Sequence, residues 1–319
     1  MDPVRPIDYY LKDRKRVAIT GHVSPDGDCL GSCLGLYNYI KDNYPQITAD
    51  VYLQEARSTF DYMPGIELVR HEDMGEDYDM LVLLDISSKE RIAFCTALLE
   101  RTKTTLCLDH HFTNPGGFTW FYNDPEASSA SEVLYRHLDP EKISKNCATC
   151  LYTGIIHDTG VFQYPATSPE TMRIAGELMG KGVDFSTIID EGFFQKTFLQ
   201  NRALGDILSN AKLYLDDQVI IGSITRKRRH ELGVEAKDLD SVVPQLRNTS
   251  EVDTAVFLYQ LDDGAYKASF RSRRLVDVSA VSAKFGGGGH IRAAGCRFEG
   301  ALDDIIETVL SALKEQLYK

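Results

Sequence analysis

Short apolar runs alternate with amphipathic stretches through the first half of the chain. The apolar runs, which predict buried strands, fall at residues 16–21, 50–54, 80–85 and 104–108. The stretches that predict helices fall at residues 28–44, 90–101, 129–137, 146–158 and 168–181. Because strands that alternate with helices form βαβ units, we expect an α/β domain with a mostly parallel sheet and helices on both faces.

The pattern changes beyond about residue 190. Residues 212–225, 254–260 and 265–271 predict strands, and residues 303–314 predict an amphipathic closing helix. We therefore expect an N-terminal domain in residues 1–190, a connecting segment in residues 191–212 and a smaller mixed α/β domain in residues 213–319.

The net charge of −12 limits the kind of partner that the chain can bind. Proteins that hold long nucleic acids present a basic face, so the acidic balance argues against a long polyanion and leaves small anions open. No apolar run is long enough to span a membrane, and the first residues lack the pattern of a signal peptide. The seven cysteines are odd in number and scattered, which fits a reducing compartment. A cytoplasmic protein without a membrane partner is therefore expected.

Acidic and imidazole side chains gather where predicted strands end and predicted helices begin or end. They form four groups along the chain: His22, Asp26 and Asp28; Asp85; Asp109, His110 and His111; and Asp158. The first three groups lie at the ends of the strands predicted at residues 16–21, 80–85 and 104–108. Since ligands of open α/β sheets bind beyond the carboxyl ends of the strands, these groups are expected to converge on one crevice.

Such a set of side chains suits two divalent cations about 3.5–4 Å apart, which clamp a phosphoryl group and lower the pKa of a bridging water. Mixed carboxylate and imidazole ligands favour Mn²⁺, with Mg²⁺, Co²⁺, Fe²⁺ or Zn²⁺ as alternatives. Taken singly, some members have simpler explanations, because Asp28 could cap its helix and Asp26-Gly27 could form a turn. Asp85 requires a partner, because it leaves a strongly apolar strand. The combination predicts a two-metal site.

Four consecutive glycines, Gly286–Gly289, followed by His290 form a second candidate site. Glycines permit positive φ angles and let backbone N–H groups come close to an anion, although a tight turn explains four glycines equally well. Upstream, Arg271 and Arg273 are two residues apart on a predicted strand, so we expect both on one face, where they could bind a phosphate. Arg271 and His290 are the first candidates for substrate binding, ahead of Arg273.

With these motifs, the chain resembles the DHH phosphoesterase superfamily with a C-terminal DHHA1 domain. The metal motifs of that family are matched by His22, Asp26 and Asp28, by Asp85, by Asp109-His110-His111 and by Asp158. The DHHA1 hallmark is matched by the sequences SFRSR at residues 269–273 and FGGGGHIRAAG at residues 285–295. The resemblance covers nearly the whole chain.

The resemblance implies a role for each of these residues. The implied ligands are His22, Asp26 and Asp85 for one metal, and Asp28, Asp85, His110 and Asp158 for the other. Asp85 would thus bridge the metals and take part in catalysis. Asp109 would orient a neighbouring side chain, and His111 would face the substrate phosphate as a catalytic acid. The residues implied in substrate binding are Arg271, Arg273, Gly287, Gly288, Gly289 and His290.

Within the superfamily, the compact chain is similar to the nanoRNase-type enzymes. The resemblance implies hydrolysis of short oligoribonucleotides or 3′-phosphoadenosine 5′-phosphate by a two-metal-activated hydroxide. Hydrolysis of cyclic di-AMP or pApA, pyrophosphatase activity and a non-catalytic nucleotide-binding regulator remain open alternatives. The extra domain of the single-strand DNA exonucleases and the membrane segments of other members are not expected here. A homodimer is compatible with the sequence.

Overall fold

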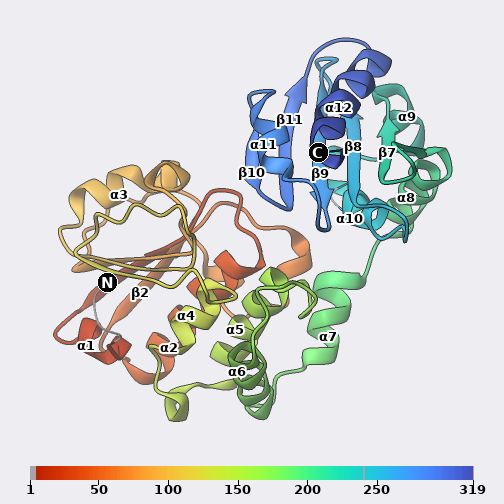
Figure 1. Cartoon of the computed structure of the whole chain (residues 1–319). Coiled ribbons are helices and arrows are strands. Elements are labelled where there is room, and N and C mark those ends of the chain that lie inside the picture. The colour runs from red at the N-terminus through yellow and green to blue at the C-terminus, as the bar shows by residue number, and fades with distance from the viewer. Residues whose placement is uncertain (1–4, 240, 319) are drawn as a thin grey trace. The chain divides into compact units, whose positions relative to one another are not determined.

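The computed structural model describes residues 5–239 and 241–318, and the side chains of residues 93–95 and 290 lie outside this description. The chain divides into two compact units, one that ends at Gln195 and one that begins at Lys196 (Figure 1). Each unit has its own sheet and its own hydrophobic core. The two-part α/β fold class expected from the sequence is confirmed.

The first unit is built on a sheet of five parallel strands. These are β1 (Arg16–Thr20), β2 (Thr48–Tyr52), β3 (Met80–Leu84), β4 (Thr105–Asp109) and β5 (Trp120–Asn123). Its α-helices are α1 (Ile7–Leu11), α2 (Gly27–Asn43), α3 (Thr96–Arg101), α4 (Ala130–Tyr135), α5 (Lys145–Asp158), α6 (Pro169–Gly180) and α7 (Phe185–Ile189). Shorter helical turns include η1 (Ser58–Phe60), η2 (Ile66–Leu68), η3 (Lys89–Cys95), η4 (Pro140–Lys142) and η5 (Asp190–Phe194).

Side chains from both faces of this sheet are buried. Val82 and Leu106 point to one face, where they join the core that includes α2, α4 and α5. Leu83 and Cys107 point to the other face, where they pack with Leu98 of α3. Because β3 and β4 are buried at every position, β3 is a continuous apolar run and β4 has three consecutive apolar residues, rather than an alternating pattern.

The strand order β2-β1-β3-β4-β5 creates a switch point between β1 and β3. From β1 the chain continues to β2 on one side of the switch point, and from β3 it continues to β4 on the other side. Loops that leave the carboxyl ends of the two strands therefore diverge, and ligands of such sheets bind in the crevice between them. His22 lies two residues beyond β1, and Asp85 directly follows β3.

Helices α2 and α5 cross in close contact, because glycines face each other at the crossing. A Cβ atom on Gly31 of α2 would lie 2.6 Å from the carbonyl oxygen of Cys150 and 2.7 Å from the backbone nitrogen of Gly154, both in α5. A Cβ atom on Gly154 would collide with Ser131 Oγ and lie 2.7 Å from Asp28 Oδ1. These glycines bring the first turn of α2 against α4 and α5.

The second unit contains a six-stranded sheet in the order β10-β11-β9-β8-β7-β6. Its strands are β6 (Lys212–Tyr214), β7 (Val219–Ile224), β8 (Thr254–Gln260), β9 (Tyr266–Ser272), β10 (Gly288–His290) and β11 (Ala293–Phe298). Strands β7 and β8 pair in parallel and the other neighbours pair antiparallel, so the sheet is mixed. The helices are α8 (Phe198–Asn210), α9 (Arg226–Leu232), η6 (Ala236–Leu239), α10 (Val242–Arg247), α11 (Val278–Ala283) and α12 (Leu302–Leu317).

Helices cover both faces of the mixed sheet. Phe270 of β9 packs on one face with Val281 of α11 and Val309 of α12. Phe257 of β8 packs on the other face with Ile207 of α8. Residues 198–210, part of the predicted connecting segment, therefore form a helix that belongs to the second unit.

Two predicted elements are interrupted in the structure. The strand predicted at residues 212–225 is wrong as a continuous element, because Leu215, Asp216 and Asp217 adopt positive φ angles of 53°, 53° and 64° and form the turn between β6 and β7. The helix predicted at residues 90–101 begins as η3 and is broken at Ile92, where φ is −103°, so its α-helical part begins at Thr96.

Candidate metal centre

Asp85 lies at the centre of the acidic and imidazole side chains, with its two oxygens facing different imidazoles. Its Oδ2 is 3.4 Å from Nε2 of His22, and its Oδ1 is 3.4 Å from Nε2 of His110. The side chain is buried, with an exposure of 3%. A carboxylate that presents each oxygen to a different ligand group has the arrangement that a residue shared by two cations requires.

The backbone of Asp85 adopts a left-handed conformation, with φ at +57°. Such a conformation is uncommon for a residue with a Cβ atom, and aspartate tolerates it better than most residues. The strand therefore ends abruptly at Leu84, and the following carboxylate turns into the crevice at the switch point.

Asp26 and Asp28 belong to the N-terminus of α2, and each has a partner in the protein. Asp26 caps the helix, since its Oδ1 accepts hydrogen bonds of 3.1 Å from the backbone N–H groups of Asp28 and Cys29, while its Oδ2 lies 3.6 Å from His22 Nε2. The buried carboxylate of Asp28 accepts hydrogen bonds from the backbone N–H groups of Ala130, at 2.6 Å, and Ser131, at 3.0 Å. Both aspartates therefore cap helices, and both also face imidazoles.

His110 connects Asp85 to the remaining carboxylates. Its Nε2 atom lies 3.2 Å from Oδ2 of Asp158, the last residue of α5, and 3.9 Å from Oδ2 of Asp28. The close crossing of α2 and α5 thus brings together Asp28 and Asp158, which are 130 positions apart in the sequence. This second group, Asp28, His110 and Asp158, has ligand atoms within 4.8 Å of one another.

His111 contacts Asp109 and also belongs to the cluster, since the ligand atoms of Asp85, His110 and His111 lie within 4.8 Å of one another. Its Nδ1 lies 2.9 Å from Asp109 Oδ1 and 3.5 Å from Asp85 Oδ1. The other oxygen of Asp109 accepts a 2.7 Å hydrogen bond from the amide of Asn114, whose Nδ2 also donates to the carbonyl of Ile86. Asp109 is fully buried, so it can fix the orientation of the His111 ring.

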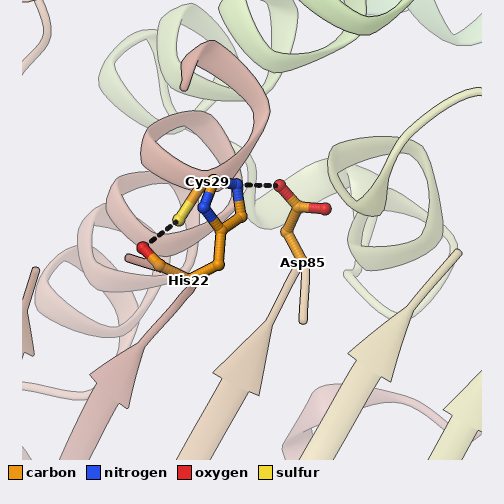
Figure 2. A group of neighbouring side chains, drawn as sticks. All are labelled: His22, Cys29 and Asp85. Atoms are coloured by element: carbon orange, nitrogen blue, oxygen red, sulfur yellow. Dashed lines mark hydrogen bonds and ion pairs between the residues drawn. The ribbon is translucent and has the colours of Figure 1, made fainter. Parts of the chain in front are cut away.

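Cys29 was not a candidate in the sequence analysis, but its sulfur lies beside the centre. The ligand atoms of His22, Cys29 and Asp85 are within 4.8 Å of one another, and Figure 2 shows the three side chains together. The thiol points to the carbonyl oxygen of His22, at 3.9 Å, and burial raises its pKa well above the usual value. Nothing in the sequence other than its position next to Asp28 indicates this placement.

The charges of the centre strongly shift the pKa values of its members. Burial alone would lower the pKa of His22, but the carboxylates of Asp26 and Asp85 outweigh it and raise the pKa to about 12. Burial also opposes ionisation of Asp85, yet His110 and His22 hold its pKa below the usual range. Burial and the neighbouring Asp85 raise the pKa of Asp28 to about 7, and burial and Asp28 raise the pKa of Asp158. These carboxylates need more positive charge than the two imidazoles supply.

The donor set fits divalent cations. Two ligand atoms that are each about 2.1 Å from one ion lie roughly 3–3.5 Å apart. The nitrogen–oxygen distances from Asp85 to His22 and His110, and from His110 to Asp158, are 3.2–3.4 Å. Carboxylate oxygens and imidazole nitrogens are suitable donors for such ions, and the clustered buried carboxylates explain why cations are required.

The predicted substrate residues of the second unit lie at one edge of its sheet. Arg271 is in β9, opposite Ala293 of β11, and β10 contains Gly288, Gly289 and the backbone of His290. The side chain of His290 lies outside the described part of the chain. Strand β11 lies between β9 and β10, so the glycine run and Arg271 are on the same side of the sheet but not on neighbouring strands.

Arg273 makes contacts of its own within the second unit. It lies beyond the end of β9, and its guanidinium donates hydrogen bonds of 3.1 Å to the carbonyl oxygens of Thr249 and Ser250. These contacts hold the loop after α10 and give Arg273 a structural explanation.

The glycines differ in what surrounds them. Gly286 and Gly289 have positive φ angles of 71° and 144°. A Cβ atom on Gly289 would also lie 2.5 Å from the Cα atom of Ala294, because β10 lies against β11. A Cβ atom on Gly288 would meet nothing within 4 Å, so packing within the unit does not explain this glycine.

Both units match known protein families. Residues 16–155 match the N-terminal domain of the DHH family, and residues 216–315 match the DHHA1 domain. Together with the fold and the strand-end carboxylates, this shows that the chain belongs to the DHH family.

Relatives with the same two-part organisation cover nearly the whole chain. The bifunctional oligoribonuclease and PAP phosphatase NrnA of Thermus thermophilus is 30% identical over 308 residues, which span 94% of this chain and 90% of the relative. The NrnA protein of Bacillus subtilis, with the same description, is 26% identical and covers 86% of each chain. The crystal structure of an exopolyphosphatase-related protein from Bacteroides fragilis has a TM-score of 0.90 at 26% identity, covering 97% of this chain and 94% of that one.

Within the described residues, no helix has the length and apolar character needed to cross a membrane.

Proposed function

We propose that this protein is a metal-dependent phosphoesterase that hydrolyses short oligoribonucleotides, 3′-phosphoadenosine 5′-phosphate, or both. The observation that carries the proposal is the position of Asp85, whose two oxygens face His22 and His110 at the switch point of a parallel sheet. The names of the Thermus and Bacillus relatives support the choice of substrates. A short substrate also suits a chain with a net charge of −12, which disfavours long polyanions.

The first unit would hold two divalent cations, for which we propose Mn²⁺. The proposed ligands are His22, Asp26 and Asp85 for one ion, and Asp28, Asp85, His110 and Asp158 for the other. When bound, the cations would neutralise the charge of the phosphoryl group and make a water molecule more acidic. The helix-capping contacts of Asp26 and Asp28 keep both carboxylates in place before any cation arrives.

His111 is proposed to hold the proton that the leaving oxygen receives. Asp109 lies 2.9 Å from Nδ1 of His111 and favours a proton on that nitrogen. The other nitrogen, Nε2, is then the ring atom from which a proton can be given to the leaving oxygen. Asn114 fixes Asp109 from the opposite side, so the ring is oriented before the substrate binds.

The second unit is proposed to choose the substrate. Arg271 would bind a phosphate that is not cleaved, and the backbone at Gly288 would lie against the same anion. The N–H groups of Gly286 and Gly287 already donate to the carbonyl oxygens of Ala283 and Ser282. The open space beside Gly288 supports this role, because a ligand can approach the backbone there. His290 remains a proposed substrate-binding residue on the basis of the sequence.

A panel of substrates tests the proposal. The purified protein would be incubated with Mn²⁺ and, separately, with an RNA 5-mer, 3′-phosphoadenosine 5′-phosphate, pApA, cyclic di-AMP and pyrophosphate. We expect release of mononucleotides or phosphate from the first two. Nucleotide binding without turnover in any divalent metal would instead support a regulatory protein, and turnover of pyrophosphate alone would support a pyrophosphatase.

A further inference from the structure

A guanidinium group lies against the metal centre and has no part in the proposed reaction so far. Arg91 belongs to η3, the segment that follows Asp85, and its side chain is exposed. One terminal nitrogen of the guanidinium, Nη2, lies 3.0 Å from Nδ1 of His22 and 3.4 Å from the carbonyl oxygen of Val23. The backbone carbonyl of Arg91 accepts a 2.6 Å hydrogen bond from the N–H group of Val23. Arg91 is therefore anchored one residue away from a proposed metal ligand.

The contact between Arg91 and His22 competes with another contact of the same imidazole nitrogen. Nδ1 of His22 also lies 2.9 Å from the carbonyl oxygen of Val23. A carbonyl only accepts, so this contact needs a proton on Nδ1, whereas a guanidinium only donates, so its contact needs a lone pair there. The two hydrogen bonds cannot exist at the same time.

Only the contact with Val23 can be a hydrogen bond of this nitrogen. Nε2 of His22 faces Asp26 and Asp85, so it is the nitrogen available to a cation, and the proton belongs on Nδ1, where the carbonyl of Val23 lies 2.9 Å away. Nδ1 therefore offers no lone pair to Arg91. The guanidinium needs another acceptor, and its backbone is anchored beside the centre.

We propose that Arg91 is a substrate-binding residue whose guanidinium contacts the phosphoryl oxygens of the scissile phosphate. This inference rests on the proposed function and adds a residue to the same site. A guanidinium presents several N–H donors in one plane, which suits the oxygens of a phosphate better than an ammonium does. The exposed position of Arg91 leaves room for a substrate to approach it.

A purely structural role predicts a different outcome. If Arg91 only supported the ring of His22, its loss would weaken metal binding, and turnover would decrease in proportion to the metal lost. If Arg91 binds phosphate, the metal content stays normal while the affinity for phosphate and kcat/KM decrease. Metal content and phosphate affinity therefore separate the two roles.

The experiment compares Arg91→Gln and Arg91→Lys with Lys89→Gln. Lys89 is an exposed cation in the same segment, where it donates to the carbonyl of Gly117 at 3.0 Å, so its substitution removes the same charge two residues away. The measurements are Mn²⁺ content by elemental analysis, binding of inorganic phosphate to the Mn²⁺-loaded protein by calorimetry, and kcat and KM for 3′-phosphoadenosine 5′-phosphate.

For Arg91→Gln we expect full metal content, phosphate binding weakened about tenfold, and kcat/KM lowered about 10- to 100-fold, as for the loss of one charge-assisted hydrogen bond. Arg91→Lys should recover part of both losses, and Lys89→Gln should resemble the unmodified protein. Phosphate affinity in Arg91→Gln equal to that in Lys89→Gln, or metal loss that accounts for the lost activity, would overturn the inference. If the unmodified protein turns over no substrate, the proposed function fails, but the phosphate titration still tests Arg91.

Discussion

Asp85 combines three properties that rarely occur together at one residue. It is buried, it adopts a positive φ angle, and its two oxygens face two different imidazoles. A residue in such a backbone conformation persists only where its surroundings fix it, and such residues cluster at functional sites. The first prediction therefore concerns this side chain.

Asp85→Asn should lower kcat by about 10³-fold or more and reduce Mn²⁺ content, because an amide cannot supply the negative charge that two cations share. Asparagine tolerates the same backbone conformation, so the fold should be retained. Asp216→Asn is the matched control, since Asp216 also has a positive φ angle, of 53°, but lies in a turn of the second unit. Turnover in Asp85→Asn comparable to that of the control would contradict the assignment.

The pKa shifts of the centre predict how metal affinity depends on pH. The pKa of His22 is raised to about 12, so without a cation its imidazole is protonated at neutral pH and must lose that proton to bind a metal. Affinity should therefore rise with pH, about tenfold per unit for each proton displaced. His110, whose pKa Asp85 also raises, must lose a proton as well. Asp28, with a pKa of about 7, adds a further displaced proton at lower pH, so the rise should be steeper below pH 7.

Calorimetric titration with Mn²⁺ between pH 6 and pH 8, in buffers with different heats of ionisation, measures both affinity and proton release. The proton release should exceed one per chain at pH 6. A metal affinity that does not change over this pH range would show that metal binding removes no proton from His22.

At the scale of elements, the crossing of α2 and α5 determines the geometry of the second group of ligands. Gly154→Ala should destabilise the protein by about 1–3 kcal/mol, because the added Cβ atom would collide with Ser131 Oγ and lie 2.7 Å from Asp28 Oδ1. It should also weaken metal binding, since Asp28 would be displaced.

Gly176→Ala is the matched control, on an exposed face of α6 where the added Cβ atom meets open space, and it should stabilise the protein by about 0.5–1 kcal/mol. Thermal unfolding of the two variants, with Mn²⁺ titrations, would be informative: equal unfolding temperatures would exclude a tight crossing.

The β10–β11 hairpin gives a similar pair of glycines in the second unit. Gly288→Ala should leave stability nearly unchanged, because its Cβ atom meets nothing within 4 Å, but should raise KM if the loop binds substrate. Gly287→Ala should instead lower the unfolding temperature, since its Cβ atom would collide with the backbone of β11. An unchanged KM in Gly288→Ala would place substrate binding away from this loop.

The order and type of the main elements could be predicted from the sequence because they follow from local periodicity. The buried strand β3 is a continuous apolar run, β4 has three apolar residues between Thr105 and Asp109, and helices α6 and α12 have clear apolar faces. Strand β5 was not predicted, since Trp120–Asn123 is only partly buried and lacks a long apolar run. The short helices α9 and α10 also lack enough turns to show a period.

The residues of the candidate site could be proposed from motifs, but their contacts could not. The capping of α4 by Asp28 joins residues that are about a hundred positions apart, and the helix crossing that creates it depends on tertiary packing. The places of Cys29 and Arg91 beside His22 likewise follow from the loops that leave β1 and β3. No local pattern marks either residue.

At the scale of the whole molecule, the two units provide separate parts of the proposed function. The first unit contains the cluster around Asp85, and the second contains Arg271 and the glycine run. The acidic net charge disfavours long polyanions, and the proposed metal centre would supply local positive charge once it is loaded. The relatives that share both units are named for activities on oligoribonucleotides and a nucleotide.

The central claim is that this cluster binds two cations and that hydrolysis depends on them. The most direct test is a titration of metal-free protein with Mn²⁺, in which bound metal and hydrolysis of 3′-phosphoadenosine 5′-phosphate and an RNA 5-mer are measured in the same samples. We predict that hydrolysis appears as the metal content approaches two ions per chain, and that Asp85→Asn shows neither. Hydrolysis by the metal-free protein, or full loading with two ions and no turnover of either substrate, would contradict the account.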